Sequence, residues 1–478
     1  MTRQLLQSVL LIVLLVYCKP ARERPAAVPD YSEVSRVDSG KAVAVMLTVY
    51  RTTLLADGKD NTLLRIAVTD SIGREIQTAS DTIRIYLDGD ADVSVAGQDA
   101  SLLTAVDTSG VEYFQSRLEN GLAWLEAKAG VNPGKTRLVV RSGTLWPVSG
   151  EIHSIHRDVE LLTPGPGQIK PLNKEIEKMI GADISFLPQF EDRGREYYEN
   201  GMQKDPVRIL ADHGFNYIKL RVFVNPENEK GYSPGRGFCG LDHTLGMARR
   251  IKDAGMKLII NFHYSDYWAD PHRQNKPAAW ESLGFEALKD TVQSYTENVL
   301  LRLEQQDTPA DMVIVGNEIN HGLLWPDGHI GRPDQLAGLL KAGVRGVRAI
   351  HRDIPVMMHL ALGGQNEEAV FWFDNMIARG VDFDIIGLSY YPRWHGTLED
   401  LDNNLSDLVR RYNKPVNVVE YSIFREEIHR IVFNLPGDMG NGTCLWEPVG
   451  FRGGFFDREG KLIEGILLYD ELSNLYLE

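Results

Sequence analysis

The feature that most constrains the fold is an alternation of short β-branched runs and amphipathic helical stretches in the second part of the chain. Eight such runs begin near residues 182, 217, 258, 313, 356, 385, 416 and 443. Helical periodicity lies between them, for example at 205–213, 242–254, 285–304, 333–351 and 399–412. Because an open doubly wound sheet usually has fewer strands, this pattern predicts an α/β fold of the (β/α)8, or TIM, barrel type. No glycine-rich phosphate loop follows the first run, which further disfavours the open sheet.

The region before the barrel has strand periodicity instead. Residues 40–163 alternate apolar and polar positions and carry turn signals such as Asp57-Gly58 and Asp88-Gly89, so they predict a small all-β sandwich. Residues 55–74 resemble the immunoglobulin-like modules of bacterial exported enzymes and adhesins. We expect this module to act as a spacer, with sugar binding as the alternative. Residues 164–170 contain Pro-Gly-Pro-Gly and predict a linker, which leaves 171–478 for the barrel.

The first residues predict export. A short basic start and an apolar stretch at 1–17 are typical of a signal peptide, and the stretch ends at Cys18. This end resembles a bacterial lipobox, which implies lipidation of Cys18, a tether at 18–39 and a place in the cell envelope, as an outer-membrane or cell-surface lipoprotein. Only Cys239 and Cys444 remain, far apart in the chain, so no disulfide is expected.

The overall charge limits the partners. A net charge of −15 without a long basic run argues against nucleic acid, because such binding needs a concentrated basic face. A neutral substrate fits better, and we expect membrane contact only through the lipid anchor.

Polar and aromatic residues follow the predicted strands, where a barrel of this type assembles its active site. They are Arg221, His263 to Asp266, Asn317-Glu318, Tyr390-Tyr391, Glu420 and Trp446-Glu447.

Two of these acids are placed for glycoside hydrolysis. Glu318 and Glu420 lie 102 residues apart, which three βα units of about 34 residues would fill, so they follow the fourth and seventh strands. A retaining glycosidase needs one carboxylic acid and one carboxylate about 5 Å apart. We therefore predict Glu318 and Glu420 as the catalytic pair, one as the acid and the other as the nucleophile, with Glu447 as a weaker rival of Glu420. Arg221 is the expected cation beside Glu420, and Asn317 would bind the sugar 2-hydroxyl.

Aromatic residues in the loops favour a sugar groove over a metal site. Several tryptophans follow predicted strands, where their flat faces can stack on sugar rings. His263 and Asp266 could suggest a metal, but no His-Glu-x-x-His or clustered His-x-His spacing occurs, so none is expected.

Six strings carry a resemblance to glycoside hydrolase family 53, the arabinogalactan endo-β-1,4-galactanases. They are Gly-Ala-Asp-Ile-Ser at 181–185, Leu-Arg-Val-Phe-Val-Asn-Pro at 220–226, the eleven-residue string at 261–271, Val-Gly-Asn-Glu-Ile at 315–319, the string at 387–396 and Trp-Glu-Pro at 446–448.

The resemblance implies that Glu318 is the general acid/base and Glu420 the nucleophile, and that the substrate is β-1,4-galactan, a side chain of pectin. It also implies that further residues bind the sugar chain, namely Arg221, His263, Asn317 and Tyr390 at the cleaved sugar and Asp266, Trp268, Trp394 and Trp446 along the groove. The chain departs from the family at Asn261, where an acid is usual, and after Glu420. We expect no cofactor. The stretch after Glu420 has no acid-rich calcium loop, and a structural calcium ion in the barrel loops stays open.

Two alternatives remain open from the sequence. One is another endo-glycanase of the same clan, a mannanase or a cellulase-like enzyme. The other is a surface glycan-binding protein without activity.

Overall fold

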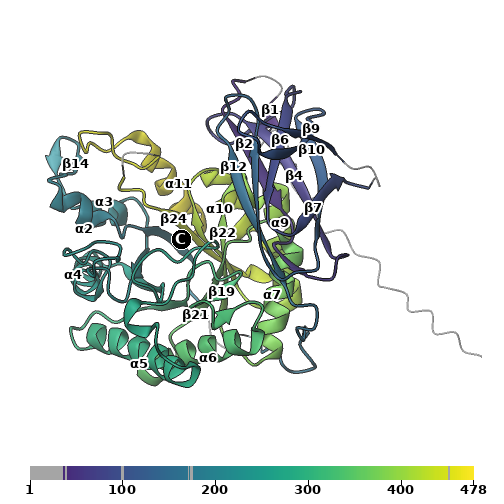
Figure 1. The fold of residues 1–478 in the computed structure, drawn as a ribbon. Coiled ribbons are helices and arrows are strands. Elements are labelled where there is room, and N and C mark those ends of the chain that lie inside the picture. The colour runs from purple at the N-terminus through teal and green to yellow at the C-terminus, as the bar shows by residue number, and fades with distance from the viewer. Residues whose placement is uncertain are drawn as a thin grey trace, which may run out of the picture.

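The computed structural model describes residues 36–37, 40–97, 102–170, 172, 176–450 and 453–477, which form a β-sandwich followed by a barrel (Figure 1). The predicted signal peptide, Cys18 and most of the predicted tether lie outside the described residues. Within the described ranges, no helix is long and apolar enough to cross a membrane.

The N-terminal region is a sandwich of two six-stranded sheets, as predicted. One sheet has the order β1-β5-β4-β10-β7, with β2 beside β4, and the other has the order β3-β12-β11-β6-β9-β8. The strands are β1 (Arg36–Val37), β2 (Ala44–Val49), β3 (Thr53–Leu55), β4 (Asn61–Thr69), β5 (Glu75–Ile76), β6 (Thr82–Asp88), β7 (Ala91–Val95), β8 (Leu103–Val106), β9 (Glu112–Arg117), β10 (Leu122–Ala129), β11 (Gly134–Arg141) and β12 (Val148–Ile155). Buried and more exposed residues alternate along β10 and β11, so one face of each strand enters a shared apolar core.

The C-terminal region is a closed parallel barrel of eight strands, which confirms the predicted fold class. The strands are β13 (Met179–Asp183), β16 (Tyr217–Val222), β17 (Lys257–Phe262), β18 (Met312–Val315), β21 (Val356–Leu360), β22 (Ile385–Tyr390), β23 (Val416–Tyr421) and β24 (Gly440–Trp446). Nearly every residue of these strands is buried, because helices cover the outside and side chains fill the inside.

Helices follow the barrel strands and form the outer layer (Figure 1). They are α2 (Leu187–Asp192), α3 (Pro206–Asp212), α4 (Leu241–Asp253), α5 (Phe285–Glu304), α6 (Pro333–Ile350), α7 (Asn366–Ala378), α8 (Pro392–His395), α9 (Leu398–Tyr412), α10 (Arg425–Phe433) and α11 (Leu467–Tyr476). Short elements in the loops are β14 (Tyr198–Glu199), β15 (Met202–Gln203), β19 (Gly322–Leu323), β20 (Gly328–His329), η1 (Ala278–Trp280), η2 (Pro436–Asp438) and η3 (Glu464–Ile466).

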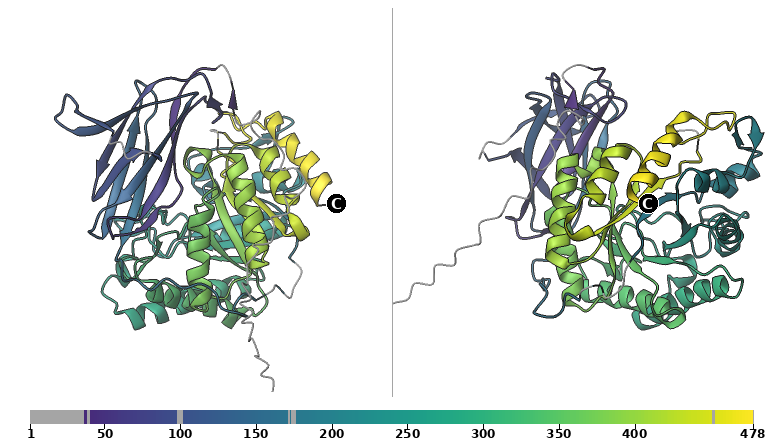
Figure 2. Two further views of the ribbon diagram at one scale, coloured as in Figure 1. Left: turned by 90° about the vertical axis from the view of Figure 1, so that its right-hand side faces the viewer. Right: turned by 180° about the vertical axis from the view of Figure 1, so that it is seen from behind.

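The sandwich lies directly against the barrel in all three views (Figures 1 and 2). The backbone amides of Thr52 and Thr53 donate to the buried carboxylate of Glu368 on α7, at 3.0 and 3.1 Å. After the sandwich the chain stays on the barrel surface, where the Leu162 amide donates to Asn375 Oδ1 at 2.9 Å. The edge of the module is therefore hydrogen-bonded to the barrel, and its expected role as a spacer stays a prediction.

Candidate active site

The interior of the barrel changes from apolar to polar toward the carboxyl ends of its strands. Alternate residues of a barrel strand face inward. On β16 the inward residues are Tyr217, then Lys219, then Arg221, and on β22 Ile385 at the base has the same parity as Ser389 near the mouth. The polar groups at these upper positions form the floor of the candidate site.

Glu318 follows β18 in an unusual backbone conformation. Its φ angle is 48°, in the left-handed region that a residue with a side chain rarely adopts. The preceding Gly316 has a φ of 86°, and a Cβ there would meet Ile319 Cγ2 at 2.6 Å, so this turn needs glycine. Backbone of this kind persists where the surrounding structure enforces it, and it is common at functional sites.

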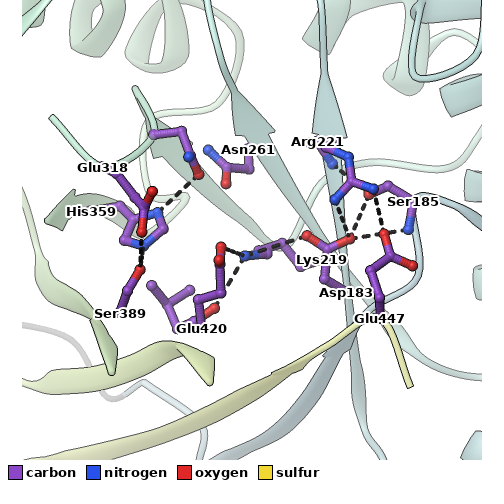
Figure 3. A network of polar contacts seen from close by, with 12 residues as sticks. Asp183, Ser185, Lys219, Arg221, Asn261, Glu318, His359, Ser389, Glu420 and Glu447 are labelled. Carbon is purple, nitrogen blue, oxygen red and sulfur yellow. Dashed lines mark hydrogen bonds and ion pairs between the residues drawn. The ribbon is translucent and has the colours of Figure 1, made fainter. Parts of the chain in front are cut away.

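A chain of polar side chains reaches Glu318 from the neighbouring strands (Figure 3). Ser389 Oγ lies 2.7 Å from Glu318 Oε1 and 2.8 Å from His359 Nε2, while His359 Nδ1 lies 3.1 Å from Asn317 Oδ1. Burial lowers the pKa of His359 well below its usual value, so this histidine is neutral. The Ser389 hydroxyl can therefore donate to ionised Glu318 or accept from protonated Glu318.

The surroundings of Glu318 favour its acid form. Burial raises its pKa, and the negative charge of Glu420 raises it further, to about 8. A carboxylic acid with this pKa is mostly protonated at neutral pH. Glu318 can therefore supply a proton to a leaving oxygen, as a general acid must.

Glu420 lies on β23 where the strand pairing becomes irregular. The register with both neighbouring strands shifts between Gly387 and Ser389 and between Val418 and Tyr421. Such irregularities re-aim side chains next to active sites. Here Val419 contributes to the apolar interior of the barrel, and the next residue, Glu420, lines the cavity at its mouth.

Two donors contact the carboxyl oxygens of Glu420. Lys219 Nζ lies 3.3 Å from Glu420 Oε2, and the hydroxyl of Tyr391 donates to Oε1 at 2.9 Å. Burial opposes the charge of Lys219, but the carboxylates of Glu420 and Asp183 outweigh it and raise its pKa. A fixed cation and a phenolic donor suit a nucleophile that must be ionised.

Arg221, predicted as the cation beside Glu420, binds other carboxylates. It forms buried ion pairs with Glu447 and with Asp183, the latter at 3.4 Å. That prediction is wrong, because the shorter and neighbouring inward residue Lys219 occupies the place beside Glu420. The sequence prediction does not include Lys219, although this residue lies two positions before Arg221 and therefore faces the same interior of the barrel. Glu447, the predicted rival, is engaged by Arg221 and by the Phe186 amide at 3.0 Å.

Asn317 and His263 are both buried, and neither is among the residues that line the cavity with Glu318. Asn317 Nδ2 donates to the Ala269 carbonyl at 2.9 Å, and the Ala269 amide donates to His263 Nδ1 at 3.2 Å. Burial, reinforced by nearby Arg221, lowers the pKa of His263 well below its usual value, so it is neutral. On the same strand end, buried Asn261 Oδ1 has no hydrogen-bond partner in the described structure, which leaves an acceptor at this level of the barrel.

Asp266 and Trp268 support the loops and do not line the main cavity. Asp266 accepts hydrogen bonds from the amides of Asn225 and Ala278, both at 2.9 Å, and thereby fixes two loops to each other. The ring of Trp268 lies 4.4 Å from the Arg221 guanidinium carbon. The structure shows contacts of both residues that position loops and Arg221, and their predicted contact with the sugar chain stays a prediction.

The structure also separates the two adjacent tyrosines. Tyr390 is buried in the layer between barrel and helices, and its hydroxyl donates to the Gly396 carbonyl at 3.2 Å. Tyr391 has the inward parity of Ser389 and reaches Glu420. The prediction of Tyr390 at the cleaved sugar is therefore wrong by one residue, and strand parity was the signal that identifies Tyr391.

One cavity of about 470 Å³ contains both candidate catalytic carboxylates. Glu318 and Glu420 lie in its wall together with Tyr391, Trp394 and Trp446. The Trp394 side chain is exposed, and the cavity is of the size that holds a small ligand. The predicted groove tryptophans Trp394 and Trp446 are thus brought to the two glutamates.

The described residues contain no group of three or more His, Cys, Asp or Glu side chains arranged to hold a metal ion. Cys239 and Cys444 are both buried and unpaired.

The barrel resembles known glycoside hydrolases. The protein-family model described as glycosyl hydrolase family 53 matches residues 179–430. An uncharacterized protein in the bgaB 5' region of Niallia circulans is 38% identical over 317 residues, which cover 58% of this chain and 84% of that protein. A probable arabinogalactan endo-beta-1,4-galactanase A of Aspergillus terreus is 38% identical over 303 residues, which cover 56% of this chain and 84% of that protein.

Solved structures agree with these sequence matches. The catalytic domain of a family 53 protein from Ignisphaera aggregans superimposes with a TM-score of 0.59 at 30% identity and covers 63% of this chain and 98% of its own. A fungal beta-1,4-galactanase superimposes with a TM-score of 0.56 at 29% identity and covers 62% of this chain and all of its own.

Proposed function

The chain belongs to glycosyl hydrolase family 53, and from this we propose that it is a retaining endo-β-1,4-galactanase that cleaves the galactan side chains of pectin, type I arabinogalactan. The observation that carries the proposal is the contrast between two glutamates in one cavity. Burial favours the acid form of Glu318, whereas Glu420 contacts the ammonium group of Lys219 and the hydroxyl of Tyr391. The relatives named as galactanases support the choice of substrate.

In the first step Glu420 attacks the anomeric carbon while the bond from that carbon to the leaving oxygen breaks. Glu318 transfers its proton to that oxygen, so the leaving chain departs as a neutral alcohol. A glycosyl ester on Glu420 results, and Glu318 is now ionised.

In the second step water replaces the ester. Esterification removes the charge of Glu420, and that charge is, after burial, the largest cause that raises the pKa of Glu318. The pKa of Glu318 therefore falls in the intermediate, which favours the carboxylate that must take a proton from water. The water oxygen bonds to the anomeric carbon, the ester bond breaks, and both glutamates return to their starting forms.

The substrate assignment is tested by product release from galactan, with β-mannan and cellulose in parallel. We expect galacto-oligosaccharides from galactan alone, separated by chromatography. Hydrolysis of mannan or cellulose instead would leave the roles of the two glutamates in place and would show that the substrate is a different glycan. The absence of hydrolysis of all three polysaccharides would favour the alternative of a glycan-binding protein without activity.

The role of Glu318 is tested with Glu318→Ala and two leaving groups. Polymer hydrolysis should fall by about 10²–10⁴-fold, the usual contribution of a general acid. An activated aryl galactoside should lose less in the first step, because its phenolate leaves without a proton. Added azide should then give a β-galactosyl azide; an α-azide, or no azide product, would contradict the assignment.

We also propose that the protein acts outside the cytoplasm as a lipid-anchored envelope protein, on the basis of the sequence before residue 18. Cys18→Ala should move the protein from the membrane to the soluble fraction. Unchanged membrane association would contradict the anchor.

A further inference from the structure

The β-sandwich forms part of the cavity that contains Glu318 and Glu420. Six sandwich residues line that cavity, namely Leu47, Val49, Thr52, Ser149, Gly150 and Glu151. They come from β2, from β12 and from the turn after β2. The matched family region begins at residue 179, so this wall lies outside the part of the chain that the family shares.

Hydrogen bonds fix the sandwich edge over the mouth of the barrel. The Trp394 Nε1 donates to the Ser149 carbonyl at 3.2 Å, and Gln365 Nε2 donates to the Val49 carbonyl at 3.3 Å. These donors lie in the loops after β22 and β21, so both loops of the barrel mouth are tied to the wall. The wall is therefore placed by several independent contacts at the cavity itself.

A cluster of three histidines closes the same interface from the side. The rings of His153 on β12 and His321 stack at 3.6 Å, and His153 Nδ1 lies 3.0 Å from His329 Nε2. His321 Nε2 also lies 3.0 Å from the Thr52 hydroxyl. Burial lowers the pKa of all three, so they are neutral and pack as aromatic rings. This packing leaves little freedom for the sandwich to move away from the loop after β18.

Strand parity turns one face of β12 toward the cavity. Val148 and Ile152 lie in the sandwich core, so Ser149, Glu151 and His153 face the barrel. Between them Gly150 lies over Leu47, where a Cβ would come within 3.2 Å of its side chain. The wall thus presents small groups around a single carboxylate.

The described contacts bind the Glu151 carboxylate through one of its two oxygens, which leaves the other oxygen able to accept a hydrogen bond. Lys135 Nζ lies 3.0 Å from Oε2, and the ring nitrogens of His153 and His272 lie 3.4 Å from the same oxygen. Among the described contacts, no hydrogen bond or ion pair engages Oε1. A fixed carboxylate oxygen in a cleft can accept hydrogen bonds from sugar hydroxyls, and such bonds to charged groups are the stronger ones.

The wall faces the side of the mouth from which the leaving chain departs. Glu318 follows β18 and its partner Ser389 lies on β22, so the acid belongs to the half of the mouth that the sandwich covers. Lys219 holds Glu420 from β16, on the opposite half. The leaving oxygen must contact Glu318, so the chain attached to that oxygen extends toward the sandwich.

We propose that β12 of the sandwich, through Ser149 and Glu151, forms the binding wall for the leaving galactosyl chain, beside the exposed ring of Trp394. This inference rests on the proposed galactanase function and adds to it. The sandwich is then a part of the active site that selects for a sugar in the leaving position.

The test compares two substrates that differ only in what leaves. β-1,4-Galactotetraose has leaving sugars that would contact the wall, whereas nitrophenyl β-1,4-galactobioside has a nitrophenolate. The quantity measured is the ratio of kcat/KM for the tetraose to kcat/KM for the nitrophenyl substrate. In Glu151→Gln this ratio should fall about tenfold, since one hydrogen bond to a charged group is lost. In Ser149→Trp it should fall further, because the indole occupies the space of the leaving sugar.

Glu112→Gln, on the exposed face of β9 in the same sandwich, is the matched control and should keep the ratio of the unaltered enzyme. Thermal unfolding checks that each variant is folded. If Ser149→Trp does not fold, the result for Glu151→Gln alone decides the test. An unchanged ratio in folded Glu151→Gln, or equal losses on both substrates, would overturn the inference alone. Hydrolysis of neither substrate by the unaltered enzyme would overturn the galactanase proposal and the inference with it.

Discussion

Two groups of buried carboxylates at the barrel mouth differ in how their charges are compensated. Glu447 and Asp183 are paired with Arg221, and Glu447 also accepts from the Phe186 amide. Among the described residues no cation forms an ion pair with Glu318, and its carboxyl group is bound by the Ser389 hydroxyl. Lys219 connects the groups, since it lies 3.4 Å from Asp183 Oδ2 and 3.3 Å from Glu420 Oε2 (Figure 3). Burial raises the pKa of Glu447 to about 8 even beside Arg221, and the pKa of Glu318 reaches a similar value. Glu318 therefore differs from Glu447 by its place in the cavity with Glu420, and not by its pKa alone.

The largest expected effect is on Glu420, the ionised member of the catalytic pair. Glu420→Gln should reduce kcat on galactan by about 10⁴-fold or more, because no covalent intermediate can form. The matched control is Glu426→Gln on α10, an exposed acid six residues away, which should keep normal activity. Comparable activity in Glu420→Gln and the control would contradict the assignment of the nucleophile.

The second test removes one carboxylate of the compensated group. Glu447→Gln breaks a buried ion pair and should lower the free energy of unfolding by about 3–5 kcal/mol, since Arg221 loses a partner without gaining access to water. Denaturant unfolding measures this. Glu459→Gln, which breaks the exposed pair with Lys461, should cause no measurable change. Equal stability of the two variants would show that the compensated group is not structural.

The third test concerns the proton on Glu318. Its acid form exists below its pKa of about 8, so kcat/KM should fall as the pH rises through about 8. In Glu420→Gln the pKa of Glu318 should move down, because a negative neighbour is removed while burial remains. A carboxyl-carbon NMR titration measures that shift. If the pKa of Glu318 stays near 8 in this variant, the raised value results from burial and not from the charge of Glu420.

The smallest expected effect is that of metal removal. The two glutamates, a lysine and a tyrosine supply the acid, the nucleophile and its charge compensation, so the proposed chemistry needs no cofactor. Activity on galactan after treatment with EDTA should equal that of untreated enzyme. A loss restored by calcium would place a structural ion in the loops.

Much of the barrel could be predicted from local pattern. The predicted starts of all eight strands fall within about three residues of the observed ones, because buried parallel strands are continuous apolar runs between amphipathic helices. Glu318 and Glu420 could be predicted because they follow two of those runs at barrel spacing, and both line the same cavity. Strand parity distinguishes Tyr391, which faces the cavity, from Tyr390, which does not. The same parity places Lys219 on the inward face of β16.

The sequence by itself determined the elements, the two carboxylates and the family, because strand and helix periodicity and short motifs are local properties of the chain. Only the tertiary structure decided which cation serves which acid, since Lys219 and Arg221 lie two residues apart and face the same interior. It also decided that the sandwich closes over the barrel mouth. That contact joins β12 to loops more than 150 residues further along the chain, and no periodicity within either segment encodes it.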